Sequence, residues 1–358
     1  MLLSELQYDL PDNLIATHPQ RPSRVMWMEG PSMPWTESSM NQEFLPTEVS
    51  MEALLQKIPQ DALLILNETK VLPRRVFTDS SLEILFLSRD AADPYLWTVL
   101  FPSKKFPVGS QIPLPLGQSM TLLEKGRPQK IRTQEILSEE YFEQVAELPL
   151  PPYIQKLRHE RHNFQQDKEW YQTAWAKEAG SLACPTASLH FSEQDLHFLE
   201  NRGVKILKIT LHVGLGTFLP VTVDDLKDHP MHEEQVQVSV LVWQQIQNAK
   251  KQGRPIMALG TTVTRALESV ARGMVPLDAS KENYRGGTNL LLQEGSVFHV
   301  VDILATNFHQ PGSTLLALVM AFAGKENVQK AYQWAKDQQF RFLSYGDLSI
   351  WFKKPPQI

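Results

Sequence analysis

The chain has 358 residues, 42% of them apolar and 21% charged, a balance typical of a soluble globular protein large enough for more than one domain. The formal net charge of -5 excludes unselective coating of nucleic acid but is compatible with a local basic groove for an RNA substrate. Cys184 is the only cysteine, which excludes an internal disulfide and favours a reducing cytoplasm. We expect no secretory signal, and no apolar run approaches the ~20 residues of a membrane span.

Short β-like runs dominate the first part of the chain. Prolines recur between Pro11 and Pro22 and disfavour regular structure there, and residues 30–50 also look irregular. A short helix is predicted at 51–58 and a strand at 62–66. Pro and Gly turns then separate four further runs of strand length, at 82–87, 95–101, 120–123 and 130–136.

These four runs predict a small all-β module within residues 67–149. Helices and strands alternate only after residue 150, so the module is interpreted as an insertion into an α/β chain. Four of its basic residues are either an RNA-facing patch or a solvated sheet edge: Arg74, Arg75, Lys104 and Lys105.

The stretch 171–192 changes character along its length. Aromatic and alanine residues around Tyr171 and Trp175 recur at helical spacing, and Gly180 is placed to end that helix. Small side chains with hydroxyls follow, a composition that lets a backbone approach a ligand. Ser192 and Asp195 then predict the start of the next helix through a near capping box. An ordinary helix-loop-helix connection explains the same pattern.

The second half of the chain has the alternation of an α/β fold with a largely parallel sheet. Helices are predicted at 239–252, 262–272, 313–323 and 327–338. Strands are predicted at 204–213, 256–259, 288–292 and 297–304, with a closing β-like segment at 340–352.

Three predicted strands deliver the chain to polar or glycine-rich turns. His212 precedes Gly214 and Gly216, but the third glycine of a dinucleotide-binding fingerprint is missing. Gly260 opens a helix whose first N–H groups, behind Thr261 and Thr262, suit a carboxylate or serve only as a helix start. His309 stands in the third turn. In an α/β fold such turns are the expected ligand sites. No cysteine or histidine spacing favours a metal.

Several motifs in order extend this pattern to a whole family. They include Asn67-Glu-Thr-Lys-Val-Leu-Pro, Pro185-Thr-Ala-Ser-Leu-His-Phe, Leu211-His-Val-Gly-Leu-Gly-Thr-Phe, Gly260-Thr-Thr, Thr306-Asn-Phe-His and Ser344-Tyr-Gly-Asp. Together they resemble the S-adenosylmethionine:tRNA ribosyltransferase-isomerase family of queuosine biosynthesis. This sequence has Ser188, Gln310 and Gly312 where the family usually has glycine, leucine and lysine.

The resemblance implies a large barrel-like α/β domain, formed by residues 1–66 and 150–358 and interrupted by a small β-barrel domain at 67–149. It implies transfer and isomerisation of the ribosyl part of S-adenosylmethionine onto 7-aminomethyl-7-deazaguanine in a tRNA anticodon stem-loop. Epoxyqueuosine-tRNA, adenine and methionine are the implied products. S-adenosylmethionine is then a consumed cosubstrate, so no cofactor is expected. We also expect a cytoplasmic monomer without membrane contact.

Chemistry at a sulfonium needs a base, so His190, His212 and His309 are candidates for proton transfer, with Glu234 or Asp347 as an orienting carboxylate. Gly260, Thr261 and Thr262 are expected to hold the methionine carboxylate, and Lys177 and Arg265 to meet RNA phosphates. The motifs imply further substrate contacts at Tyr171, Ser181, Pro185, Thr186, Phe191, Gly214, Gly216, Thr217, Asn307, Phe308 and Tyr345. Two alternatives are a non-catalytic tRNA-binding homologue and an ordinary methyltransferase.

Overall fold

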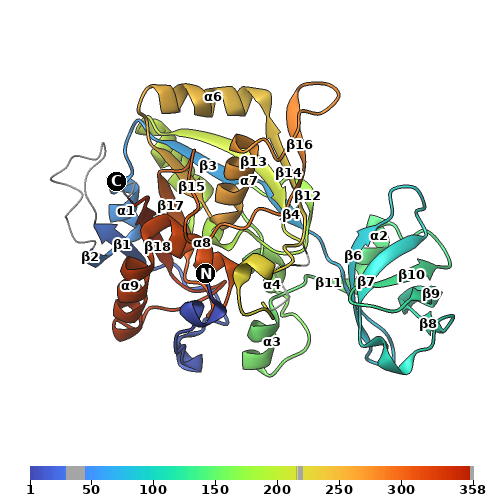
Figure 1. The fold of residues 1–358 in the computed structure, drawn as a ribbon. Coiled ribbons are helices and arrows are strands. Elements are labelled where there is room, and N and C mark those ends of the chain that lie inside the picture. Colours follow the sequence, from blue (N-terminus) through green and yellow to red (C-terminus); the bar gives the residue numbers. More distant parts are fainter. Residues whose placement is uncertain (30–44, 215, 217–220, 355–358) are drawn as a thin grey trace. The chain divides into compact units, whose positions relative to one another are not determined.

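The computed structural model describes residues 1–29, 45–214, 216 and 221–354. The chain divides into two compact units (Figure 1). The large unit consists of Met1–Lys70, Gln172–Glu178 and Cys184–Ile358, and the small unit of Val71–Tyr171 and Ala179–Ala183. No helix among these described residues is long and apolar enough to cross a membrane.

A nine-stranded mixed sheet organises the large unit, in the order β16-β14-β13-β3-β15-β17-β18-β1-β2. The central strands β13, β3, β15 and β17 run parallel to one another, whereas β18 is antiparallel to β17 and parallel to β1. The strands are β1 (Val25–Glu29), β2 (Leu45–Val49), β3 (Leu63–Asn67), β13 (Lys205–His212), β14 (Glu234–Ser239), β15 (Ile256–Leu259), β16 (Asn283–Thr288), β17 (Ile303–Asn307) and β18 (Leu348–Phe352).

Helices cover both faces of this sheet, which explains why its central strands are apolar throughout. All residues of β3, β15 and β17 are buried. Leu64 and Leu66 of β3 belong to a core cluster with residues of α1 and α5, while α7 contacts β3 and β15. The helices of the large unit are α1 (Met51–Lys57), α5 (Glu193–Asn201), α6 (Val240–Lys251), α7 (Thr261–Ala271), α8 (Thr314–Ala323) and α9 (Lys325–Asp337).

The helices predicted at 51–58, 239–252, 262–272, 313–323 and 327–338 are confirmed to within a few residues, and with them the mixed α/β class. The capping box that starts α5 is present, because Ser192 Oγ accepts from Asp195 N at 3.2 Å and Asp195 accepts from Ser192 N at 2.8 Å. Three strand predictions were wrong in extent. Residues 289–292 and 297–302 are not strand, and only Leu348–Phe352 of the segment 340–352 is. Strands β1 and β2 were missed, and the remaining part of the predicted irregular segment, 30–44, lies outside the described residues.

The helix predicted around Tyr171 and Trp175 was also wrong. Only α4 (Asp167–Trp170) is helical, and Glu178–Ser181 forms β12, which pairs with β4 (Thr69–Val71). Tertiary hydrogen bonds override the helical spacing. Trp175 Nε1 donates to Asn67 O at 3.1 Å, and the N–H groups of Lys177 and Glu178 both donate to Glu68 O.

The small unit is built on a seven-stranded antiparallel sheet in the order β11-β5-β6-β7-β10-β9-β8. Edge-to-face ring contacts of Phe86, Trp97 and Phe142 lie in its core. The four predicted runs are strands, but the unit also contains helices. Its elements are β5 (Arg75–Phe77), β6 (Glu83–Arg89), β7 (Leu96–Leu100), β8 (Gln111–Pro113), β9 (Ser119–Glu124), β10 (Gln129–Thr133), β11 (Ala146–Glu147), α2 (Glu139–Val145), α3 (Pro152–Arg158) and α4.

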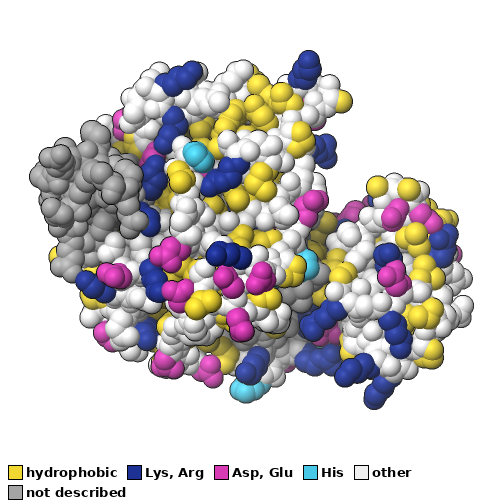
Figure 2. Space-filling model, viewed as in Figure 1, with side chains coloured by type: hydrophobic (Ala, Val, Ile, Leu, Met, Phe, Trp, Pro, Cys, Tyr) yellow, Lys and Arg dark blue, Asp and Glu magenta, His cyan; other side chains and the backbone are white. Residues whose placement is uncertain are grey.

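Two of the four predicted basic surface residues are buried. Arg74 and Arg75 are 5% and 3% exposed; Arg74 pairs with Glu139, and Arg75 with Glu83 and Glu147. Both therefore hold the small unit together and are excluded from a surface patch. Lys104 and Lys105 are exposed. Figure 2 shows that lysine and arginine side chains gather on the visible face of this unit.

Candidate active site

The site predicted from the three turns lies along one edge of the large sheet. Parallel strands β3, β13, β15 and β17 end at Asn67, His212, Leu259 and Asn307, so their carboxyl ends share this edge. Because β18 runs the other way, its first residue, Leu348, pairs with Asn307 and lies at the same edge. With neighbouring strands about 4.8 Å apart, His212 and Asn307 stand three strands, about 14 Å, from each other.

The side chain of Asn67 bridges β3 and β13 at the point where the backbone hydrogen bonds between these strands end. Its side chain donates to Leu211 O at 2.9 Å and accepts from Leu211 N and Thr69 N, each at 3.1 Å. Asn67 is fully buried. Its amide therefore replaces the backbone bonds that the diverging strands lose, and it holds the residues before His212 in place.

We expect Asn67→Ala to reduce the free energy of unfolding by about 2–4 kcal/mol, because it leaves buried N–H and C=O groups of Leu211 and Thr69 unsatisfied. Urea unfolding followed by circular dichroism measures the change. The exposed Asn201→Ala on α5 serves as the control. Equal midpoints for the two variants would contradict this role.

His212 is partly exposed and is hydrogen-bonded through one nitrogen. Its Nδ1 lies 2.7 Å from Thr69 Oγ1, and the same hydroxyl lies 3.5 Å from Glu178 O. Partial burial lowers the pKa of His212; the Glu178 carboxylate raises it and Arg285 lowers it further. The imidazole at the end of β13 is thus influenced by a carboxylate and a guanidinium, and the Thr69 hydroxyl fixes the orientation of its ring.

Glu234 and Arg265 form a buried ion pair next to the turn that follows β13. The Nη1 atom of Arg265 donates to Glu234 Oε2, and Glu234 Oε1 accepts from Gly214 N at 3.3 Å. The Arg265 side chain is 9% exposed and that of Glu234 is 5% exposed. This burial excludes the predicted contact of Arg265 with an RNA backbone phosphate, which needs a surface side chain. Glu234 orients Arg265 and the Gly214 turn.

The turn between β15 and α7 is formed by small residues, Gly260, Thr261 and Thr262. Gly260 has a φ of +100°, a conformation that favours glycine, and its N–H donates to Ala305 O of β17. A Cβ on Gly260 would lie 3.7 Å from Ala187 Cβ. The predicted loop 185–191 and the predicted Gly260 turn are therefore neighbours.

His190 lies in this loop and is enclosed by polar groups. Its Nδ1 is 2.6 Å from Ser23 Oγ. Burial lowers the pKa of His190 to about 3; the Asn307 side chain raises it in part, and the positive charges of Arg341 and Arg21 lower it further. Asn307 Nδ2 donates to Leu343 O at 3.0 Å, which leaves its Oδ1 as the atom available to the ring. His190 is therefore a neutral imidazole at pH 7.

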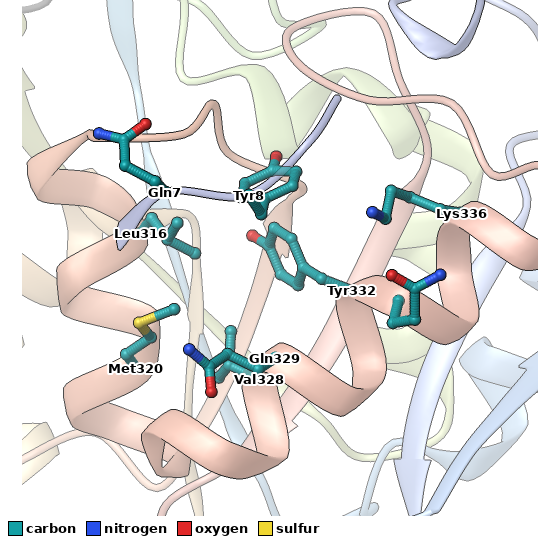
Figure 3. A pocket seen from close by; sticks show the side chains of 9 residues that line it. Gln7, Tyr8, Leu316, Met320, Val328, Gln329, Tyr332 and Lys336 are labelled. Atoms are coloured by element: carbon teal, nitrogen blue, oxygen red, sulfur yellow. The ribbon is translucent and has the colours of Figure 1, made fainter. Parts of the chain in front are cut away.

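His309 is bound through both its backbone and its ring. Tyr332 Oη accepts from His309 N at 3.0 Å, Tyr8 Oη donates to His309 O, and Thr306 Oγ1 lies 3.0 Å from Nε2. Burial lowers the pKa of His309 to about 3. Tyr8 and Tyr332 pack edge to face, with ring centroids 5.4 Å apart (Figure 3).

The same two tyrosines line a cavity of 240 Å³ between α8, α9 and the N-terminal segment (Figure 3). None of the predicted site residues lines it. The cavity therefore lies next to the two tyrosines that hold the His309 turn, and it is separate from the predicted site.

Asp347 is fully buried at the start of β18. It accepts from Arg341 N at 2.7 Å, from Arg341 Nη2 at 3.1 Å and from Arg24 N at 3.3 Å. These bonds join the segment before β1 to the segment before β18. Asp347 therefore orients Arg341, one of the charges near His190.

The sequence matches the profile of a known family, described as "Queuosine biosynthesis protein", over residues 3–350. The chain belongs to this family. Proteins named S-adenosylmethionine:tRNA ribosyltransferase-isomerase from Desulfitobacterium hafniense and Citrifermentans bemidjiense are each 37% identical to it over 362 residues, covering 97% of this chain and 98% of theirs. The crystal structure of S-adenosylmethionine tRNA ribosyltransferase from Thermotoga maritima is 27% identical, with a TM-score of 0.52, and covers 97% of this chain and 99% of that one.

The resemblance predicted from the motifs is thereby confirmed. The chain departs from the usual motifs of the family at three positions. Ser188 is fully buried, and its Oγ has no partner among the described residues. Gln310 is exposed. Gly312 has a φ of +68°, and a Cβ there would lie 2.9 Å from Gln7 Nε2, so glycine fits this turn better than a lysine would.

The remaining residues that were predicted to contact the substrate differ in their exposure to solvent. Lys177 is exposed, and Thr186 and Gly216 are partly exposed. Phe308 is fully buried against Tyr332, Phe340 and Phe342, and is therefore a core residue. Also buried are Phe191, Pro185 and Tyr345 in the large unit, and Tyr171 and Ser181 in the small unit. Thr217 lies outside the described residues.

Three residues with a clear part in the site were not predicted as site residues: Thr69, Ser23 and Arg341. Thr69 stands in the Asn67 motif, so a hydroxyl two residues after a strand end was a usable signal. Ser23 and Arg341 are far from His190 in sequence and give no local signal. Cys184 is buried, which raises the pKa of its thiol and makes it a poor nucleophile. No metal-binding group of three or more His, Cys, Asp or Glu side chains occurs in the described part of the chain.

Proposed function

We propose that this protein is an S-adenosylmethionine:tRNA ribosyltransferase-isomerase, a transferase of queuosine biosynthesis that modifies tRNA. It transfers and isomerises the ribosyl moiety of S-adenosylmethionine onto 7-aminomethyl-7-deazaguanine in the anticodon, and releases adenine and methionine. The observation that carries the proposal is family membership over residues 3–350, with relatives of that name covered almost from end to end. The motif residues His212, Gly260 and Asn307 lie at one sheet edge, which supports it.

His212 is the proton-transfer residue in this proposal. Removal of a proton next to the sulfonium requires a base that the substrate can reach and that binds a proton near neutral pH. The pKa values of His190 and His309 are both lowered to about 3 by burial, so neither gains a proton readily. Burial lowers the pKa of His212 as well, but the Glu178 carboxylate beside this ring raises it in part and so supports the protonated form.

Thr69 selects the tautomer that this role needs. Its hydroxyl donates to Glu178 O and accepts from the Nδ1–H of His212. The lone pair of the ring is then on Nε2, where a base takes up the proton. His190 and His309 position the surrounding loops through their contacts with Ser23 and Thr306.

We take the small unit, Val71–Tyr171 with Ala179–Ala183, as the counterpart of the β-barrel domain that the family resemblance implies at 67–149. Its antiparallel sheet and its exposed Lys104 and Lys105 suit a contact with the tRNA anticodon stem-loop. S-adenosylmethionine is consumed, so the reaction needs no further cofactor. A cytoplasmic location agrees with a single buried cysteine and a tRNA substrate, and we take the protein to be a monomer.

One incubation tests the function. Purified protein, S-adenosylmethionine and tRNA carrying 7-aminomethyl-7-deazaguanine are expected to yield adenine, methionine and epoxyqueuosine-tRNA, measured by mass spectrometry. The same tRNA with unmodified guanine should give none of these products.

The two alternative functions give other products. S-adenosylhomocysteine with methylated RNA would identify a methyltransferase. Bound tRNA without any turnover would identify a non-catalytic homologue. Either result would overturn the proposal.

A further inference from the structure

The start of α7 offers backbone donors that the protein leaves unused. Gly260 precedes the helix and has no side chain to cap it. Among the described residues, no hydrogen bond satisfies the N–H groups of Thr261, Thr262 and Val263. The free N–H groups and the helix dipole favour an anion at this position.

A buried guanidinium adds a second, independent feature. Arg265 follows Thr261 by four residues, so the two share a helix face, and helical side chains lean toward the N-terminus. Its Nε donates to Leu290 O at 3.3 Å and its Nη1 to Glu234. The Nη2 atom is buried and has no hydrogen-bond partner among the described residues. An arginine that is 7% exposed thus keeps donors that only a ligand or water can satisfy.

The residues around the start of α7 favour a small ligand with a single negative charge. Small groups line the turn. The atoms nearest to a Cβ on Gly260 would be Thr262 Oγ1 at 3.6 Å and Ala187 Cβ at 3.7 Å. Glu234 balances one positive charge, so the helix start and the spare Nη2 donors suit a single negative charge. Gly260 and Thr261 are buried, which favours a small-molecule carboxylate over an RNA backbone phosphate as the ligand.

We propose that Arg265 recognises the carboxylate of the methionine end of S-adenosylmethionine and so determines selectivity for the carboxylated cosubstrate. The N–H groups at the start of α7 donate to one carboxylate oxygen, and Arg265 Nη2 donates to the other. Glu234 positions the guanidinium. This inference rests on the proposed function, since it names how that cosubstrate is bound.

The test compares S-adenosylmethionine with its decarboxylated analogue in wild-type protein and in Arg265→Gln. The wild type is expected to prefer the carboxylated form. Losing one charge-assisted hydrogen bond should lower kcat/KM of the variant for S-adenosylmethionine by about 10- to 100-fold, through KM, and change that for the analogue little. Isothermal titration with each cosubstrate, without tRNA, gives the same comparison independently of turnover.

Two further variants separate recognition from folding. Arg265→Gln leaves the Glu234 carboxylate buried and unpaired, whereas Arg265→Gln combined with Glu234→Gln removes both charges. The double variant should fold and still lack the preference. Arg272→Gln changes an arginine at the C-terminal cap of α7 that is also paired with a glutamate; this variant is the matched control and should keep the preference.

Three results would overturn the inference: equal use of both cosubstrates by the wild type, an unchanged preference in the double variant, or weakened tRNA affinity with an intact preference. Each is distinct from failure of the proposed function. If the proposed function itself fails, the wild type will turn over neither cosubstrate.

Discussion

Replacing His212 with glutamine is expected to reduce kcat by about 10²- to 10⁴-fold, the usual loss when a general base is removed. Glutamine keeps a hydrogen bond to Thr69 Oγ1, which lies 2.7 Å from Nδ1 in the wild type, but it cannot take up a proton. The fold and the affinity for S-adenosylmethionine should therefore change little. Single-turnover release of adenine with modified tRNA measures the chemical step, and calorimetry measures binding.

Matched substitutions at the other two histidines test the choice between them. In His190→Gln and His309→Gln a flexible amide replaces the packed ring that contacts Ser23 or Thr306, so thermal stability should fall. Their single-turnover rates should stay close to the wild-type rate. A large rate loss at His190 or His309, together with normal turnover by His212→Gln, would assign the base to another residue.

Local signals predicted most of the large unit because its elements agree with their own sequence. Helix α7 begins after Gly260, and α5 has its Ser192 capping box, so propensity and tertiary packing favour the same structure. The segment around Trp175 had helical spacing, yet hydrogen bonds to Asn67 and Glu68, more than 100 residues earlier, draw it into an extended path. A pattern within one segment cannot reveal such partners.

The site residues, too, were predictable only in part. His212 and Gly260 were predictable because each follows an apolar strand of the parallel sheet, and such strands end at one edge. The environment of each side chain was not predictable. Arg265 was expected to meet RNA and instead pairs with Glu234, because β14 returns antiparallel to β13 and brings the carboxylate over α7. His190 depends on Ser23 and Asn307, which only the fold brings to it.

Glu268 explains why residues 297–302, predicted to be strand, form a loop instead. Its side chain is fully buried on α7 and accepts from the N–H groups of His299, Val300 and Val301 at 2.8, 2.9 and 3.2 Å. Arg272 donates to it at 2.9 Å. The carboxylate thus takes the backbone donors that a strand would have used, just before β17 leads to Asn307 and His309.

Glu268→Gln is expected to destabilise the large unit by about 3–5 kcal/mol, because the amide supplies neither the negative charge nor enough acceptors for four donors. Denaturant unfolding measures the loss, and Glu326→Gln, at an exposed position of α9, is the control. The loop leads directly into β17, so hydrogen exchange should also quicken at residues 299–307 before global unfolding. Exchange and stability equal to those of the control would show that water can replace the carboxylate and that the apolar residues of β17 alone hold this strand in the sheet.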